Sequence, residues 1–300
     1  MNLRQLQYFV TVVDEGNITR AAQRLYVAQP SLSKQLAALE AELGGPLIER
    51  LHRQIRLTPS GKAFLPEARV AILAAERARR AARMAHDLEA GELEVATLQS
   101  IAIGLLPRSI QLLRKRHPGI LVELQEYQSR DDLEDHVRGG VADIAVGPRP
   151  PEWEGPVASL GWEEFVIVLP EGDPLLRDPG PLELTDLAQR RWVLPVPAAG
   201  MARLVSAACR DAGFLPQPAT HSSQVEALAR LAACGLGPAM LPDNVISPDL
   251  RHLTRRLRRP MARELAAYTR QDWSPAARAF LQTLWDAASA PQPENAYIAP

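Results

Sequence analysis

The sequence has few cysteines, no long apolar run and no export signal, and each absence excludes a class of protein. Its 300 residues include only Cys209 and Cys234, too few for the disulfide framework of a small secreted protein. No stretch approaches the ~18 apolar residues that a transmembrane helix needs; the most apolar surrounds Phe165–Leu169. The first residues lack the basic-then-apolar pattern of a signal peptide. We therefore expect a cytoplasmic protein without membrane contact.

The chain also lacks a large net charge, but its charges are unevenly distributed. The chain has 34 basic and 35 acidic residues. Residues 1–90 hold 13 basic and 9 acidic residues, a net charge of +4, and the remainder carries −5. The length suits two domains of ordinary size. A basic front predicts that any nucleic-acid contact lies there.

Helical spacing of apolar residues predicts three short helices at the front. The helices span 3–15, 18–25 and 30–43. In the third, four leucines form one stripe that must face the core, so Ser31 and Lys34 point the other way. No carboxylate precedes Glu40 in this helix. A tight turn followed by a helix with a polar N-terminal end is the geometry that reads base edges in the major groove.

Basic residues alternate with apolar ones over 49–58, which predicts a short two-stranded wing. Arg50, Arg53 and Arg56 suit phosphate neutralisation or entry into the minor groove. The alternative is a merely solvated loop. Their position directly after a helix-turn-helix favours the DNA role.

A long helix is predicted over 60–89, with a thin apolar seam. The seam consists of Leu65, Ala68, Ile72, Ala75 and Ala82. So narrow a seam needs a partner helix, which favours a dimerisation linker over a simple spacer. Pro66 is expected to kink the helix near its start.

Strands and helices alternate behind Gly91, which predicts parallel sheets in two α/β lobes with a cleft between them. Open α/β sheets bind ligands beyond the carboxyl ends of their strands. This rule selects Thr97, Gln99, Ser100, Ile101, Gln128, Ser129, Pro148, Arg149, Gly200 and Met201 as candidate ligand contacts. For Arg149, an anion contact and a solvated side chain remain equally open, and any of the polar residues could simply cap a helix or turn.

Catalytic and metal-binding patterns are missing. The six histidines are scattered, and no phosphate-binding loop or nucleophile elbow occurs. We therefore predict no enzyme activity, no metal and no cofactor. Both cysteines are expected to be small buried hydrophobic residues. The arginine-rich run 251–263 is expected to be a solvated, salt-bridged face rather than a DNA patch.

Residues 4–61, RQLQYFVTVVDEGNITRAAQRLYVAQPSLSKQLAALEAELGGPLIERLHRQIRLTPSG, resemble the winged helix-turn-helix of LysR-type transcriptional regulators. The rest, to about residue 287, is similar in organisation. The resemblance implies an N-terminal all-α winged helix-turn-helix over 1–58, a linker helix over 59–90 and a C-terminal α/β two-lobed periplasmic-binding-protein-like sensor domain over 91–290. The first lobe would comprise 91–162 and 264–290, the second 163–263, and 291–300 would form a flexible tail. Lys34 stands where the family usually has arginine, which retains the charge but loses the bidentate guanine contact.

The resemblance also implies partners. The expected contacts to double-stranded DNA are Thr19, Gln29, Pro30, Ser31, Ser33, Lys34, Arg50, Arg53 and Arg56. In the family, small and often anionic metabolites bind between the lobes, at positions matching Ser100 and Ser129. Family members form at least dimers and usually tetramers, and contact RNA polymerase; in its peroxide-sensing branch, two cysteines form a redox switch. The rival reading is a solute-binding or enzymatic α/β protein with an incidental helical front.

Overall fold

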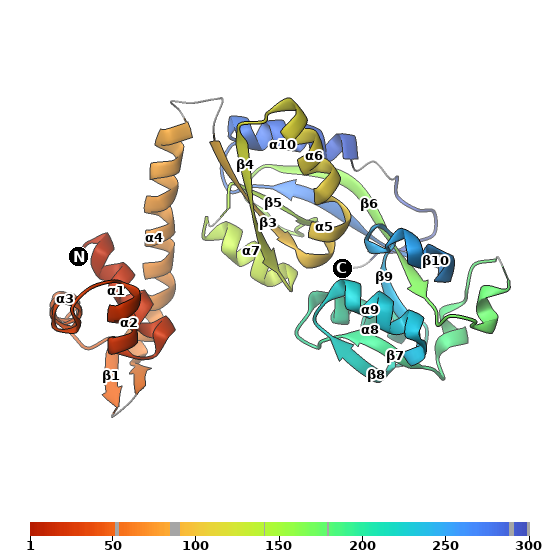
Figure 1. Ribbon diagram of the computed structural model, residues 1–300, viewed down its shortest axis with the longest axis horizontal. Helices are drawn as coiled ribbons and strands as arrows, with labels where there is room; N and C mark the ends of the chain where they lie inside the picture. Colours follow the sequence, from red (N-terminus) through yellow and green to blue (C-terminus); the bar gives the residue numbers. More distant parts are fainter. Residues whose placement is uncertain (52–53, 85–90, 141, 179, 288–290, 299–300) are drawn as a thin grey trace. The chain divides into compact units, whose positions relative to one another are not determined.

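The computed structural model describes residues 1–51, 54–84, 91–140, 142–178, 180–287 and 291–298. The chain divides into two compact units, Met1–His86 and Asp87–Pro300 (Figure 1). Among the described helices, none combines the length and apolar character required to cross a membrane.

The first unit packs three short helices, a two-stranded hairpin and one long helix around a single core. Its elements are α1 (Leu3–Glu15), α2 (Ile18–Arg24), α3 (Gln29–Glu42), β1 (Ile48–Leu51), β2 (Gln54–Leu57) and α4 (Pro59–Met84). The core includes Phe9, whose ring centroid lies 5.4 Å from that of Phe64 on α4. The α4 seam contributes to this same core through Leu65, Ala68 and Ile72.

Short-range signals fix the helix ends. Asn2 and Gln5 form a reciprocal capping box at the start of α1, and Gly16 ends that helix with φ 61°. The Asn17 side chain accepts hydrogen bonds from the backbone N–H groups of Thr19 (2.8 Å) and Arg20 (3.2 Å), which starts α2. These caps fix both ends of α1 and the start of α2.

The hairpin is attached to the helices by polar contacts. The Glu40 carboxylate accepts hydrogen bonds from the N–H groups of Leu47 (2.8 Å) and Ile48 (3.2 Å). The Thr58 hydroxyl donates to the Pro46 carbonyl (2.7 Å) and accepts from the Gly61 N–H (3.0 Å). Helix α4 continues to Met84, and the expected helical residues 85–89 lie outside the described part of the chain.

The second unit contains a seven-stranded sheet and a separate two-stranded sheet. Its main elements are β3 (Gly91–Leu98), α5 (Gln99–Gly104), α6 (Leu106–Arg116), β4 (Ile120–Tyr127), α7 (Arg130–Arg138), β5 (Ile144–Pro148), β6 (Val157–Val168), β7 (Arg191–Pro195), α8 (Gly200–Asp211), β8 (Gln217–Ser222), α9 (Val225–Leu231), β9 (Ala239–Pro242), β10 (Thr254–Tyr268), α10 (Pro275–Ala287) and β11 (Tyr297–Ile298). Short 3-10 turns lie between several of them.

Two long antiparallel strands, β6 and β10, run through both lobes of this unit, so its main sheet is mixed rather than parallel as expected. At one end, residues 265–268 of β10 lie between β5 and β6, in the first lobe with β3 and β4. At the other end, residues 254–256 pair with 166–168 of β6, which also pairs with β9 in the second lobe. The register shifts between Arg256 and Met261, where the chain passes from one lobe to the other.

Three further sequence-based expectations for this unit need correction. The apolar periodicity of 103–117 predicts one helix, but the structure has two, because Pro107 has no N–H to continue the α5 ladder and instead opens α6. The sequence pattern of 225–234 predicts a helix that reaches Cys234, but α9 ends at Leu231 and is followed by a π-type turn containing the left-handed Gly235. The end of the chain is not all a flexible tail, since Tyr297 and Ile298 pair with Met261 and Ala262 of β10.

The close contact at Gly61 generates a stability prediction. A β-carbon there would lie 2.0 Å from the Leu47 carbonyl oxygen and 3.0 Å from the Leu57 side chain, so backbone would have to move. We expect Gly61→Ala to lower the free energy of unfolding by about 1–3 kcal/mol, as overpacking does. Thermal unfolding of the full chain measures this. The matched control is Gly45→Ala, where nothing lies within 4 Å of the added carbon; equal stability of the two variants would contradict the contact.

Candidate functional site

The N-terminal end of α3 is exposed and free of carboxylates. Gln29, Pro30, Ser31 and Lys34 are exposed, and Ser33 is half-buried. The Gln29 side-chain amide donates to the Ser33 hydroxyl (3.1 Å). On the opposite face, the buried leucines of α3 enter the unit's core. The polar tip therefore points away from the core, as its sequence pattern predicts.

The start of α3 also leaves backbone donors without a side-chain cap. Its N-cap is Ala28, which has no side-chain acceptor. The unpaired N–H groups of a first helical turn attract anions, and phosphate oxygens suit them. The same tip thus combines one cation, hydroxyl groups and backbone donors.

Of the remaining expected DNA contacts, the structure describes Thr19 and Arg56 with their side chains and Arg50 by its backbone alone. Thr19 is exposed in the first turn of α2. Arg56 is exposed on β2, opposite Glu49 in the hairpin register. The backbone of Arg50 lies in β1, opposite Ile55. Arg53 lies outside the described residues.

Between the lobes of the second unit lies a cleft of about 580 Å³. The lobes contribute apolar and basic side chains to its lining. The lining residues that the argument uses are Arg130, Asp131, Arg203, Arg210, His221 and Arg263, with Met201 and Leu194 among the apolar ones. Of the ten residues selected from the strand ends, Pro148, Gly200 and Met201 line the cleft. Its size suits a small metabolite.

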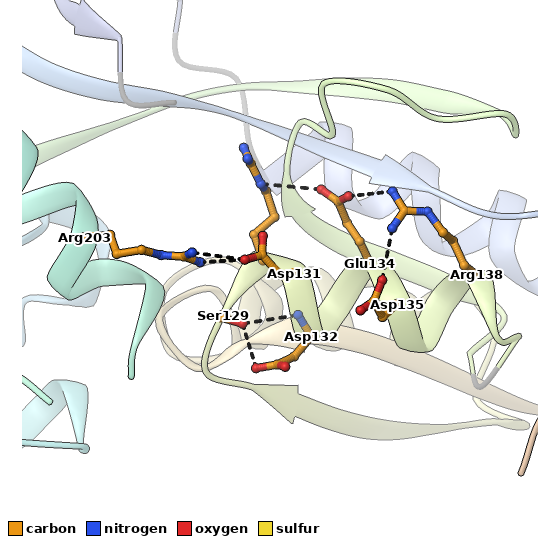
Figure 2. Close-up of polar contacts among 8 residues, drawn as sticks. Ser129, Asp131, Asp132, Glu134, Asp135, Arg138 and Arg203 are labelled. Carbon is orange, nitrogen blue, oxygen red and sulfur yellow. Dashed lines mark hydrogen bonds and ion pairs between the residues drawn. The ribbon is translucent and has the colours of Figure 1, made fainter. Parts of the chain in front are cut away.

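Four others of the selected residues make contacts within the protein. The Thr97 hydroxyl is fully buried and donates to the Val146 carbonyl (2.8 Å). Ile101 is a core residue. Ser129 caps α7, since its hydroxyl accepts from the Asp132 N–H (3.2 Å) and donates to the Asp132 carboxylate (2.6 Å; Figure 2). Arg149 pairs with Glu264 (3.1 Å).

Gln99 and Gln128 lie near the cleft without lining it. Gln99 opens α5 and is half-buried, and the side chain of Gln128 is exposed. The Gln128 carbonyl, however, accepts a hydrogen bond from the Gly200 N–H (2.9 Å), which joins the two lobes. A β-carbon at Gly200 would lie 3.4 Å from the Ser129 Cα, so the two backbones are in close contact there.

A second cross-lobe contact connects α7 with α8. Both terminal nitrogens of Arg203 lie 3.0 Å from one carboxylate oxygen of Asp131 (Figure 2). Both side chains are more than half exposed, so the pair contributes at most about 1 kcal/mol to stability. The pair is therefore a weak connection between α7 and α8.

Ser100 participates in a buried network that sequence reasoning missed. Its hydroxyl accepts a hydrogen bond from Arg263 Nη2 (2.9 Å). Arg263 is paired with Glu163 (2.6 Å), and Asn244 Nδ2 donates to the other oxygen of Glu163 (2.9 Å). The guanidinium also lies 5.3 Å from the centroid of the Phe165 ring. Arg263 and Glu163 are 3% and 4% exposed, so the pair is held in the protein interior.

This network corrects the expectation that 251–263 is uniformly solvated. Four of its arginines are exposed and ion-paired as expected; they are Arg251, Arg256, Arg258 and Arg259. Arg255 and Arg263 are buried because β10 turns them inward. Arg255 donates to the carbonyls of Leu175 and Gly180. The alternation of inward and outward side chains along a strand could have indicated that these two arginines are buried. The many arginines in the run made this alternation hard to recognise.

The charges lining the cleft favour an anion. The residues that line it include four arginines and one aspartate. Behind the surface, Glu163 pairs with Arg263 and Glu134 with Arg130 (3.5 Å), while Asp131 pairs with Arg203. Among the described residues, no carboxylate lies within ion-pair distance of Arg210. The cleft therefore has one uncompensated arginine beside the exposed His221.

The two cysteines are not alike. Cys209 is buried, and burial raises the pKa of its thiol to about 12. Cys234 is exposed in the π-type turn, so the expectation that it is a buried hydrophobic residue is wrong. Within the described ranges, no three His, Cys, Asp or Glu side chains are grouped so as to hold a metal ion.

Comparison with known proteins assigns both units of the chain to known families. Residues 3–62 match the family described as bacterial regulatory helix-turn-helix protein, lysR family, and residues 86–289 match the LysR substrate binding domain. The chain is 31% identical to the HTH-type transcriptional regulator ClcR of Pseudomonas putida, over 82% of this chain and 84% of ClcR. It is 32% identical to the Hca operon transcriptional activator HcaR of Escherichia coli (strain K12), over 81% and 82%.

Solved structures give the same result for the fold. The LysR family transcriptional regulator CbnR superimposes with a TM-score of 0.74 at 25% identity, covering 97% of this chain and all of CbnR. Full-length CbnR complexed with target DNA gives 0.73 at 26% identity, covering 96% and 100%. These relatives are regulators rather than enzymes, which excludes the alternative hypothesis of a solute-binding or enzymatic α/β protein. The chain belongs to the LysR family of DNA-binding transcriptional regulators and carries that family's effector-binding domain.

Proposed function

We propose that the exposed tip of α3 enters the major groove and that an anionic effector bound between the lobes regulates this contact. The observation that carries the DNA half is the carboxylate-free tip of α3, directed away from the core. In this assignment residues 1–58 bind DNA, 59–90 dimerise and 91–290 bind effector. Ser31, Ser33 and Lys34 read bases, while Thr19 and the hairpin arginines contact phosphates.

The base-reading and phosphate-contacting roles separate experimentally. A DNA site is first selected from a random duplex pool, and affinity is then measured on it and on a scrambled duplex. We expect Lys34→Ala to reduce the ratio of the two affinities about 10- to 100-fold, because one base contact is lost (about 1–3 kcal/mol). We expect Arg56→Ala to reduce the affinity for both duplexes by the same factor. The slope of log affinity against log salt concentration should become about 1 less steep.

The control is Lys115→Ala, an exposed lysine of α6 in the other unit, which should leave both affinities and the salt slope unchanged. If Lys34→Ala keeps the wild-type preference, α3 does not read the groove.

The effector half of the proposal is supported by the charge and size of the cleft. Arg210 lines the cleft from α8, and the guanidinium of Arg263 is held rigidly at its base by Glu163 and Ser100. Apolar side chains such as Leu194 and Met201 line the same space. We infer a small carboxylate with an apolar body, whose carboxylate binds the arginines. Binding that bridges the lobes favours the closed arrangement, which gives the ligand the differential affinity that regulation requires.

Removal of the uncompensated arginine tests the effector class. Thermal unfolding is measured with a panel of aliphatic and aromatic monocarboxylates and dicarboxylates, since a ligand at about 100 times its Kd stabilises by about 2.7 kcal/mol. We expect Arg210→Ala to weaken the best carboxylate about tenfold or more, because a charged hydrogen bond contributes about 1.5–3 kcal/mol.

The control for this variant is Arg230→Ala, an exposed arginine of α9 that pairs with Asp249 outside the cleft. It should leave the carboxylate affinity unchanged. Equal stabilisation of wild type and Arg210→Ala by every carboxylate would remove Arg210 from the effector site.

We also propose that the protein is at least a dimer, and a tetramer by resemblance to its family. The first half of the α4 seam packs within its own unit, so a partner would contact the later part of the helix. Leu121 and Leu124 are 55% and 40% exposed on the edge strand β4 and add apolar surface for a second contact. Contact with RNA polymerase is part of the same proposal and rests on the resemblance alone.

A further inference from the structure

An exposed tyrosine lies in the turn between α2 and α3, in a backbone conformation that disfavours it. Tyr26 has φ 53°, in the left-handed region. Its N–H donates to the Gln23 carbonyl (3.1 Å), and the Val27 N–H donates to the Ala22 carbonyl (3.0 Å). These two bonds form a Schellman motif at the end of α2, and this motif requires a left-handed residue at position 26.

Elsewhere the same unit uses glycine for this conformation. Gly16 (φ 61°) follows α1 and Gly44 (φ 79°) follows α3. Among the described residues of Met1–His86, Tyr26 is the one left-handed residue that has a side chain. Because a β-carbon disfavours this region, helix stability alone would select glycine or asparagine at position 26.

Packing does not offset this cost. The Tyr26 side chain is 96% exposed. It makes no hydrogen bond, ion pair or ring contact with any residue that the structure describes. A strained and solvated aromatic side chain that contributes nothing to the fold is a feature found where function requires it.

We propose that Tyr26 is a DNA contact whose phenolic hydroxyl donates a hydrogen bond to a backbone phosphate beside the groove that α3 occupies. The inference rests on the proposed function of α3. Three peptide units separate Tyr26 from Gln29, so their Cα atoms are at most about 11 Å apart. The major groove is about 12 Å wide. With the α3 tip in the groove, this distance leaves the Tyr26 hydroxyl within reach of the phosphates at its border, which tyrosine hydroxyls commonly contact.

The test compares Tyr26→Phe and Tyr26→Gly with the wild-type full chain, on the selected DNA site and on a scrambled duplex. We expect Tyr26→Phe to bind both duplexes about tenfold more weakly, equivalent to one hydrogen bond to a charged group. The salt slope should not change, because a neutral donor releases no counterion. Tyr26→Gly should bind equally weakly while its unfolding temperature stays the same or rises, a combination that a structural role would not produce.

Lys34→Ala, measured in parallel, separates the two proposals. If Tyr26→Phe binds DNA like wild type while Lys34→Ala loses sequence preference, the Tyr26 contact is overturned and the α3 assignment stands. Wild-type DNA binding by Tyr26→Phe together with unchanged preference in Lys34→Ala overturns both. Full affinity in Tyr26→Gly also overturns the contact.

Discussion

The ligand-binding unit depends on a buried ion pair between directly opposite residues of its two long antiparallel strands. Arg263 of β10 and Glu163 of β6 would each be costly alone, since breaking a buried pair costs about 3–5 kcal/mol. Ser100 and Asn244 complete their hydrogen bonds from opposite lobes. The pair therefore fixes both strands and sets one guanidinium at the base of the cleft.

The DNA-binding unit could be predicted almost entirely from local sequence, because its signals act over a few residues. Asn2, Gly16 and Asn17 mark helix ends by their own chemistry, and the leucine stripe of α3 decides which face is exposed. The family resemblance of residues 4–61 agrees with these helix ends and with the exposed face of α3. Even here one feature escaped, since no spacing rule distinguishes an ordinary turn tyrosine from the left-handed Tyr26.

The position of the cleft could be predicted from the strand ends, but most of the side chains that line it could not. Strand order predicts where the lobes meet, yet the strand register decides which side chains enter, and register depends on pairing between distant segments. Thus the Thr97 hydroxyl bonds to the neighbouring strand β5 and Ser129 caps its own helix, whereas Arg263 lines the cleft from a run that was expected to be a solvated face. Arg203 and Asp131, 72 residues apart, meet only because α7 and α8 face each other.

The short parallel strand β11 restricts how far the lobes can separate. Helix α10, which ends at Ala287, packs against α6 and β3 of the first lobe, while Tyr297 packs into the core of the second. The chain between these residues has a contour length of at most about 35 Å. It connects the two lobes a third time beside β6 and β10, so Ala287 and Tyr297 cannot lie further apart than this length.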